Sequence, residues 1–158
     1  MRTTRLWVMW VLIMSLALSG LGAFDYDAYR PYKLADVIKE QASTRVGDWN
    51  IVGAEFKYRV SVSFSGEIRP IDPKIRTLIG MWLKSTGRDA QKVDLFAHEA
   101  KVTEGDVAYW LPVQEALVKP LKSEVEKGNR LDGFVLWIGS TKDTFIFLLN
   151  EFTTEKGV

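Results

Sequence analysis

The sequence predicts an α+β fold in which most strands run antiparallel. Residues 56–64 alternate between apolar and polar side chains, which is typical of a strand with one buried face. Residues 73–86 have the apolar stripe and the end signals of a helix. Residues 93–111 and 131–152 each contain two strand-like runs separated by a short turn, as in a hairpin. Half-buried strands and hairpins together favour an antiparallel sheet.

Residues 1–23 have the pattern of a secretory signal peptide. Arg2 and Arg5 precede a run from Leu6 to Phe24 without any charged residue, and small residues follow its apolar core. The alternative is an uncleaved N-terminal anchor, although a membrane-spanning helix needs about 20 apolar residues. In both cases the positive end stays inside and the rest is exported. We therefore expect a periplasmic or secreted protein, or a membrane-anchored one with its domain outside the cytoplasm.

The rest of the chain is expected to form one globular domain over residues 24–152, followed by a flexible polar tail over residues 153–158. Residues 33–43 predict the first helix, because apolar side chains recur in them at helical spacing. Residues 56–64 predict the first strand. One of its faces is apolar, and Lys57, Arg59, Ser61 and Ser63 lie on the other.

The helix over residues 73–86 has the clearest boundaries in the chain. Asp72 is a favourable N-cap, and Pro73 suits the first helical position because its missing N–H has no partner there. Gly87 is expected to end the helix as a C-terminal cap.

Residues 93–103 and 107–111 predict two strands that pair across a Glu104-Gly105-Asp106 turn. A helical stripe follows over residues 113–125, where Pro120 is expected to kink or interrupt the helix.

The last two strands are predicted over residues 131–138 and 144–152, joined by a short loop. The second of them is apolar on both faces, which predicts burial on both sides. Trp137 lies in an apolar run and is expected in the core.

Five strands with a helix between the third and the fourth resemble the element order of the OB-fold, a small Greek-key barrel. Residues 93–152 carry this likeness, and the extra helix at residues 73–86 departs from it. The resemblance implies a five-stranded OB-like small barrel with peripheral helices. The alternative is an open antiparallel sheet covered by helices.

Composition excludes several kinds of site. The chain has no cysteine and one histidine, His98, so thiolate chemistry and multi-histidine metal sites are impossible. Its 21 basic and 20 acidic residues give a net charge of +1, which lacks the basic excess of nucleic-acid-binding proteins. No phosphate-binding or dinucleotide motif is present, and we expect no cofactor.

Four residues are candidates for binding. Lys57, Arg59 and Arg69 follow the polar face of the first strand and could form a mildly basic strip that meets an anionic group. Trp110 faces away from its neighbours Tyr109 and Leu111, so it could anchor a partner. In both cases the simpler interpretation is an ordinary structural role, as a solvated strand face or as packing against a helix.

These patterns favour an exported, non-enzymatic binding or accessory domain that contacts a protein or envelope component. The leader, if uncleaved, would be its one contact with the membrane. The alternative is a small carboxylate-dependent envelope hydrolase, which needs two acids about 5 to 10 Å apart in a cleft. Its candidate acids, which no spacing singles out as a pair, are Glu67, Asp72, Glu99 and Glu104.

Overall fold

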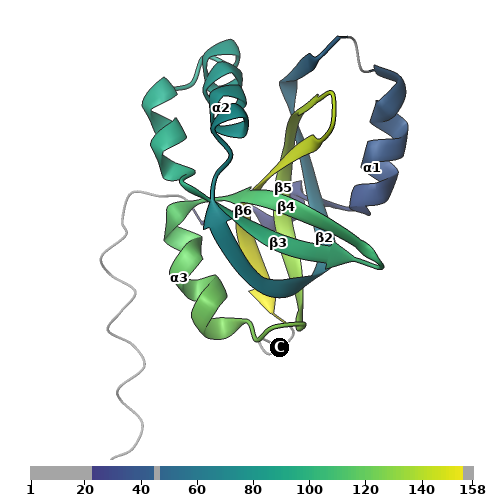
Figure 1. Cartoon of the computed structure of the whole chain (residues 1–158), viewed down its shortest axis with the longest axis vertical. Coiled ribbons are helices and arrows are strands. Elements are labelled where there is room, and N and C mark those ends of the chain that lie inside the picture. The colour runs from purple at the N-terminus through teal and green to yellow at the C-terminus, as the bar shows by residue number, and fades with distance from the viewer. Residues whose placement is uncertain (1–22, 45–46, 155–158) are drawn as a thin grey trace, which may run out of the picture.

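A computed structural model describes residues 23–44 and 47–154 of the chain, and Figure 1 shows helices placed around a central barrel. The predicted leader therefore falls almost entirely outside the described residues, as do residues 155–158 of the predicted tail. The strands are β1 (Arg30–Pro31), β2 (Trp49–Pro70), β3 (His98–Glu104), β4 (Val107–Val113), β5 (Arg130–Thr141) and β6 (Phe145–Thr154). The α-helices are α1 (Leu34–Gln41), α2 (Pro73–Ser85) and α3 (Glu115–Glu124), and the short 3-10 helices are η1 (Tyr26–Ala28), η2 (Ala42–Thr44) and η3 (Ala90–Leu95).

The sheet closes into a five-stranded barrel. Its strand order is β1-β2-β3-β4-β6-β5, and β2 also pairs with β5, which joins the two ends of the five-stranded part. The strand β1 lies outside the barrel and runs parallel to β2. Within the barrel β4 and β6 are parallel, and the other neighbours are antiparallel. This is the OB-like barrel that the sequence predicted, with α3 between its third and fourth strands, and the open-sheet alternative is wrong.

The strand β2 extends well beyond its alternating segment and pairs with different strands along its length. It spans residues 49–70, and its pairing partners are β5 along its first part and β3 along its last part. Val60 and Val62 are buried inside the barrel, and Ser61 between them is exposed, as the alternation predicted. The register shifts twice, between Ile51 and Phe56 and between Phe64 and Ile68, and such shifts bend a strand around a barrel.

The three predicted helices are confirmed with small changes at their ends. Asp72 caps α2, because its carboxylate accepts a hydrogen bond from the Lys74 N–H at 2.7 Å. Gly87 follows α2 with a φ of 69°, a conformation that glycine adopts without strain. Pro120 lies inside α3 without ending it, since the helix runs to Glu124.

One predicted strand begins too early. Residues 93–97 are not part of β3, and most of them belong to η3, whose N-cap is Asp89. The Asp89 side chain accepts from the Gln91 N–H at 2.9 Å, which favours a helical turn. Val93 then packs against the core under α2, so its apolar character reflects tertiary packing. At the other end β6 extends to Thr154, two residues into the predicted tail.

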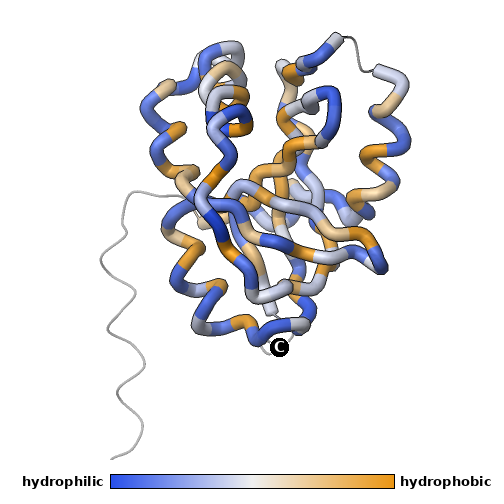
Figure 2. Tube along the Cα trace, in the orientation of Figure 1, coloured by the Kyte–Doolittle hydropathy of each residue, from blue (hydrophilic) through white to orange (hydrophobic). Residues whose placement is uncertain are grey.

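The barrel wall separates two hydrophobic cores. Phe147 and Leu149 of β6 point into the barrel, whereas Ile146 and Leu148 point outward to a second core under α2. The predicted burial of this strand on both faces is thus confirmed, and Trp137 is 2% exposed. Figure 2 shows hydrophobic residues recurring along the central strands.

None of the helices within residues 23–44 and 47–154 is long and apolar enough to cross a membrane.

Candidate functional site

The barrel opens between β4 and β6. These two strands form a single ladder pair, Val113 with Leu149, at the end of β4. Toward the start of both strands a cleft of about 240 Å³ occupies the space between them. Its walls are residues 108–112 of β4, residues 144–147 at the start of β6, and Arg69, Asp72, Ile75 and Glu99 from neighbouring elements.

Main-chain groups of β4 face this opening. The turn between β3 and β4 is two residues long, so Glu104 and Val107 form the hydrogen-bonded pair next to it. Hydrogen-bonded and non-hydrogen-bonded pairs alternate along an antiparallel ladder. The N–H and C=O groups of Ala108 and Trp110 therefore point away from β3 and toward the opening. Gln114 continues this alternation, and its N–H donates to the Leu149 carbonyl at 3.5 Å, where β4 and β6 meet.

The outer wall of the cleft is built around Trp110. Strand register places Arg69 opposite Glu99, and β4 carries Trp110 beside them. The Arg69 guanidinium carbon lies 3.8 Å from the centre of the Trp110 ring, a close cation–π contact. Arg69 Nε also donates to Glu99 Oε2 at 2.9 Å. These two contacts position the side chains of Arg69 and Trp110 at the mouth of the cleft.

Glu99 is the most enclosed charged group of the cleft. Its side chain is 3% exposed, whereas that of Arg69 is 47% exposed. A carboxylate has two oxygens and about four acceptor sites, and a buried charge without enough donors is costly. Among the described residues, the Nε of Arg69 is the one hydrogen-bond donor recorded for this carboxylate. The carboxylate therefore has acceptor capacity to spare at the edge of the cleft.

Two polar residues, Lys101 and Tyr109, are neighbours of Trp110. Lys101 lies beyond Trp110, with its Nζ 5.8 Å from the ring centre and 2.8 Å from Glu67 Oε1. Tyr109 lines the cleft, and burial together with the charge of Glu104 raises the pKa of its hydroxyl. At neutral pH this hydroxyl is a hydrogen-bonding group without charge.

A second groove of about 340 Å³ continues from the cleft around the end of the barrel. The two cavities share Asp72, Ile75 and Thr144 as lining residues. Trp49 lines the second groove and is 45% exposed. Each cavity is thus lined by one tryptophan, and the start of α2 and the β5–β6 turn border both.

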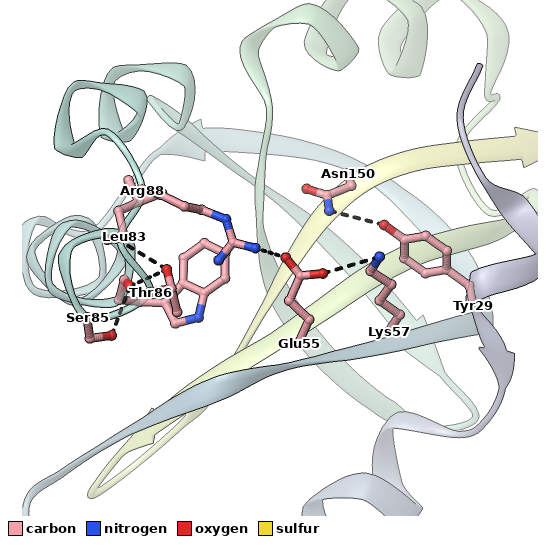
Figure 3. Close-up of polar contacts among 9 residues, drawn as sticks. Tyr29, Glu55, Lys57, Leu83, Ser85, Thr86, Arg88 and Asn150 are labelled. Atoms are coloured by element: carbon pink, nitrogen blue, oxygen red, sulfur yellow. Dashed lines mark hydrogen bonds and ion pairs between the residues drawn. The ribbon is translucent and has the colours of Figure 1, made fainter. Parts of the chain in front are cut away.

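The structure separates the predicted basic strip into three parts. Arg69 lies at the cleft, but Lys57 belongs to a different cluster. Figure 3 shows Glu55 between the guanidinium of Arg88 and the ammonium of Lys57, which is 3.2 Å from the carboxylate. This cluster links β2 to the segment after α2, and Lys57 does not line the cleft.

Arg59 lies in a third place. It lines a wide, open groove with Ser61 and Arg130, and the guanidinium of Arg130 donates to Ser61 Oγ at 2.7 Å. Of the four predicted binding residues, the structure therefore brings together Arg69 and Trp110, and it places Lys57 and Arg59 elsewhere. The pairing of Arg69 with Trp110 depends on the register of three strands, which local sequence patterns do not determine.

Sequence reasoning missed the contribution of β6. Residues 144–147 form one side of the cleft, and nothing in their pattern distinguishes an edge facing a ligand from a buried strand. The OB-like element order was the one available signal, because OB barrels are partly open.

Comparison of the chain with models of known protein families, with curated proteins and with solved structures finds no match. Within residues 23–44 and 47–154, no three acidic or histidine side chains gather as a potential metal site.

Proposed function

We propose that this chain is an exported, non-enzymatic binding module that holds a protein or envelope component in the cleft between β4 and β6. The observation that supports it most is the paired position of Trp110 and Arg69 at the mouth of this cleft. Tryptophan and arginine are enriched among residues that dominate binding energy. The leader pattern of residues 1–23 supports a periplasmic or secreted location.

The position of the cleft agrees with the way OB-folds bind ligands. Their ligands contact the second and third strands and the loops that follow the first and fourth strands. In this chain those elements are β3, β4, the segment with α2 and the β5–β6 turn, all of which border the cleft. This support is an analogy between folds, since one fold serves many functions.

The proposal is tested by capturing partners from a cell-envelope extract with the tagged mature domain. Trp110→Ala is expected to lose the captured partner, because the indole lines the cleft and tryptophan is among the residues that dominate binding energy. Arg69→Ala is expected to weaken capture, and Arg76→Ala is its matched control. Arg76 is also an arginine paired with a carboxylate, Asp94, and is 43% exposed, but it lies outside the cleft lining. Equal capture by wild type and Trp110→Ala would exclude the cleft as the binding site.

Export is tested separately. Mass spectrometry of the protein purified from its native cells is expected to find a mature N-terminus near residue 24. A chain that begins near Met1 and stays in the membrane fraction would support the anchored alternative. A chain that begins near Met1 in the cytosol would contradict export.

A carboxylate hydrolase is the second candidate, because Asp72 and Glu99 line the same cleft. Both acids already have structural partners, since Asp72 caps α2 and Glu99 is paired with Arg69. The test is hydrolysis of oligosaccharides from the envelope by wild type, Asp72→Asn and Glu99→Gln. Turnover that disappears in both variants would favour the enzyme over the binding module.

A further inference from the structure

We propose that the cleft binds an extended peptide segment, which adds to the free edge of β4 and places a lysine or arginine side chain against Glu99. This inference rests on the proposed binding function and specifies the chemistry of the partner. Two independent features support it: the main-chain groups along the opening, and the charges of its lining.

The main-chain groups of β4 along the opening favour an extended partner. Ala108 and Trp110 direct both N–H and C=O groups toward the opening, in the spacing of a strand edge. On the opposite side of the cleft, the Leu149 carbonyl accepts a hydrogen bond from the Gln114 N–H. Phe147 lies two residues before Leu149 on β6, so its main-chain groups point in the same direction, toward β4. An extended peptide satisfies such groups by strand addition, and pockets for its alternate side chains supply specificity. A compact ligand would have no such match to a repeating edge.

The charged residues that line the cleft favour a positively charged side chain in the ligand. The cleft is lined by Asp72, Glu99 and Arg69, so two negative charges face one positive charge. Glu99 is the buried member, and its carboxylate has one recorded donor among the described residues. A basic side chain in the cleft would supply the missing charge and further charge-assisted hydrogen bonds. An acidic side chain would meet a buried carboxylate of like charge.

The aromatic groups fit the same partner. Trp110 presents a partly exposed indole beside the β4 edge, where it can cover the aliphatic stem of a lysine. The second groove, which shares Ile75 with the cleft and is lined by the exposed Trp49, offers a surface for the rest of the segment. The occupant is therefore an extended polypeptide segment with one basic residue at its centre.

The test uses three blocked heptapeptides with alternating Thr and Val around a central lysine, norleucine or glutamate. Each is titrated into isotopically labelled protein and followed by NMR chemical shifts of the backbone amides. The lysine peptide is expected to shift the amides of Ala108 and Trp110 and to bind at least about tenfold more tightly than the glutamate peptide, because charge-assisted hydrogen bonds are strong. N-methylation of alternate peptide bonds is expected to abolish binding, since it removes the donors of the added strand.

Variants give a second readout. Glu99→Gln keeps the shape of the side chain and is expected to remove the preference for lysine over norleucine, while Arg76→Ala keeps it. The peptide series on wild-type protein gives the charge preference without any variant, even if Glu99→Gln is unstable. Absence of binding by all three peptides, shifts confined to another face, or tighter binding of the glutamate peptide would each overturn it.

The two proposals fail in different ways. If an envelope partner is captured through Trp110 but the peptides show no charge preference, the binding module stands and its ligand is not a basic peptide. If capture does not depend on Trp110 and no peptide shifts the cleft amides, both proposals are wrong.

Discussion

The two hairpins of the barrel differ in what covers them. The β5–β6 hairpin is buried on both faces, with Phe147 inside the barrel and Leu148 under α2. The β3–β4 hairpin is buried on its inner face, where Val102 is 1% exposed, but its outer face carries the accessible residues Lys101 and Trp110. The outer face of β6 is therefore part of a core, whereas the outer face of the β3–β4 hairpin borders the cleft proposed to bind a ligand. Substitutions on the outer face of β6 should therefore destabilise the protein much more than those on the outer face of the β3–β4 hairpin.

The largest effect is expected at Leu148. Its side chain is 1% exposed in the core under α2, and Leu148→Ala should lower the free energy of unfolding by about 2–5 kcal/mol through lost burial and a cavity. Chemical denaturation measures this loss. The matched outer-face substitution on the other hairpin, Lys101→Ala, removes a surface ion pair and should cost at most about 1 kcal/mol. Equal losses would contradict this difference between the two outer faces.

The next effect is expected where β5 passes β2. Gly139 has a φ of 148°, and a Cβ added there would lie 2.1 Å from the Asn50 carbonyl oxygen. Gly139→Ala should therefore destabilise the fold by about 1–3 kcal/mol or prevent barrel closure. Gly53→Ala is the control in β2, because a Cβ there meets nothing within 4 Å. A thermal unfolding midpoint in Gly139→Ala equal to that of Gly53→Ala would be inconsistent with this tight crossing.

A smaller effect is expected at the tip of the β3–β4 hairpin. The Glu104 carboxylate accepts from the N–H groups of Leu34 and Ala35, at 2.9 and 3.0 Å, and so caps α1 from a distant part of the chain. The N-cap residue itself, Lys33, has no side-chain cap hydrogen bond. Glu104→Ala should cost about 1 kcal/mol and speed hydrogen exchange in α1. Unchanged exchange in α1, with Asp106→Ala as control, would show that this contact does not stabilise the helix.

The smallest effect is expected at alkaline pH. A hydrogen bond to the Glu40 carboxylate, followed by desolvation and nearby negative charge, raises the pKa of Tyr32 from 10.0 to about 12. Folding thus favours the protonated phenol, so its contribution to stability is complete below pH 10 and is lost as the pH rises through about 12. The free energy of unfolding, measured across this pH range, should fall more steeply in wild type than in Tyr32→Phe. Superimposable pH profiles of the two proteins would show that Tyr32 makes no such contribution to stability.

Much of the fold could be predicted because its signals are local. The alternation around Val60 and Val62, and the Asp72 and Gly87 boundaries of α2, depend on neighbouring residues alone. The early start assigned to β3 failed because Val93 is apolar for packing against α2, and a periodic pattern cannot identify the partner.

The candidate site was less predictable. Arg69 and Trp110 could be singled out by residue type, but their contact depends on the register of β2, β3 and β4. Lys57 and Arg59 precede the register shift that bends β2 around the barrel, and Arg69 follows it, so they do not meet at one cavity. Barrel closure is a property of the whole chain, so residues that alternate on one strand need not share one site.

Amide hydrogen exchange at Ala108 and Trp110 tests the central claim most directly, because their N–H groups border the opening between β4 and β6. In the free protein both amides should exchange faster than that of Val102, which lies in the neighbouring strand. In complex with its captured partner, or with the lysine heptapeptide, both should slow while exchange in α3 stays the same. A bound complex in which these two amides exchange at their free rates would show that the ligand sits elsewhere.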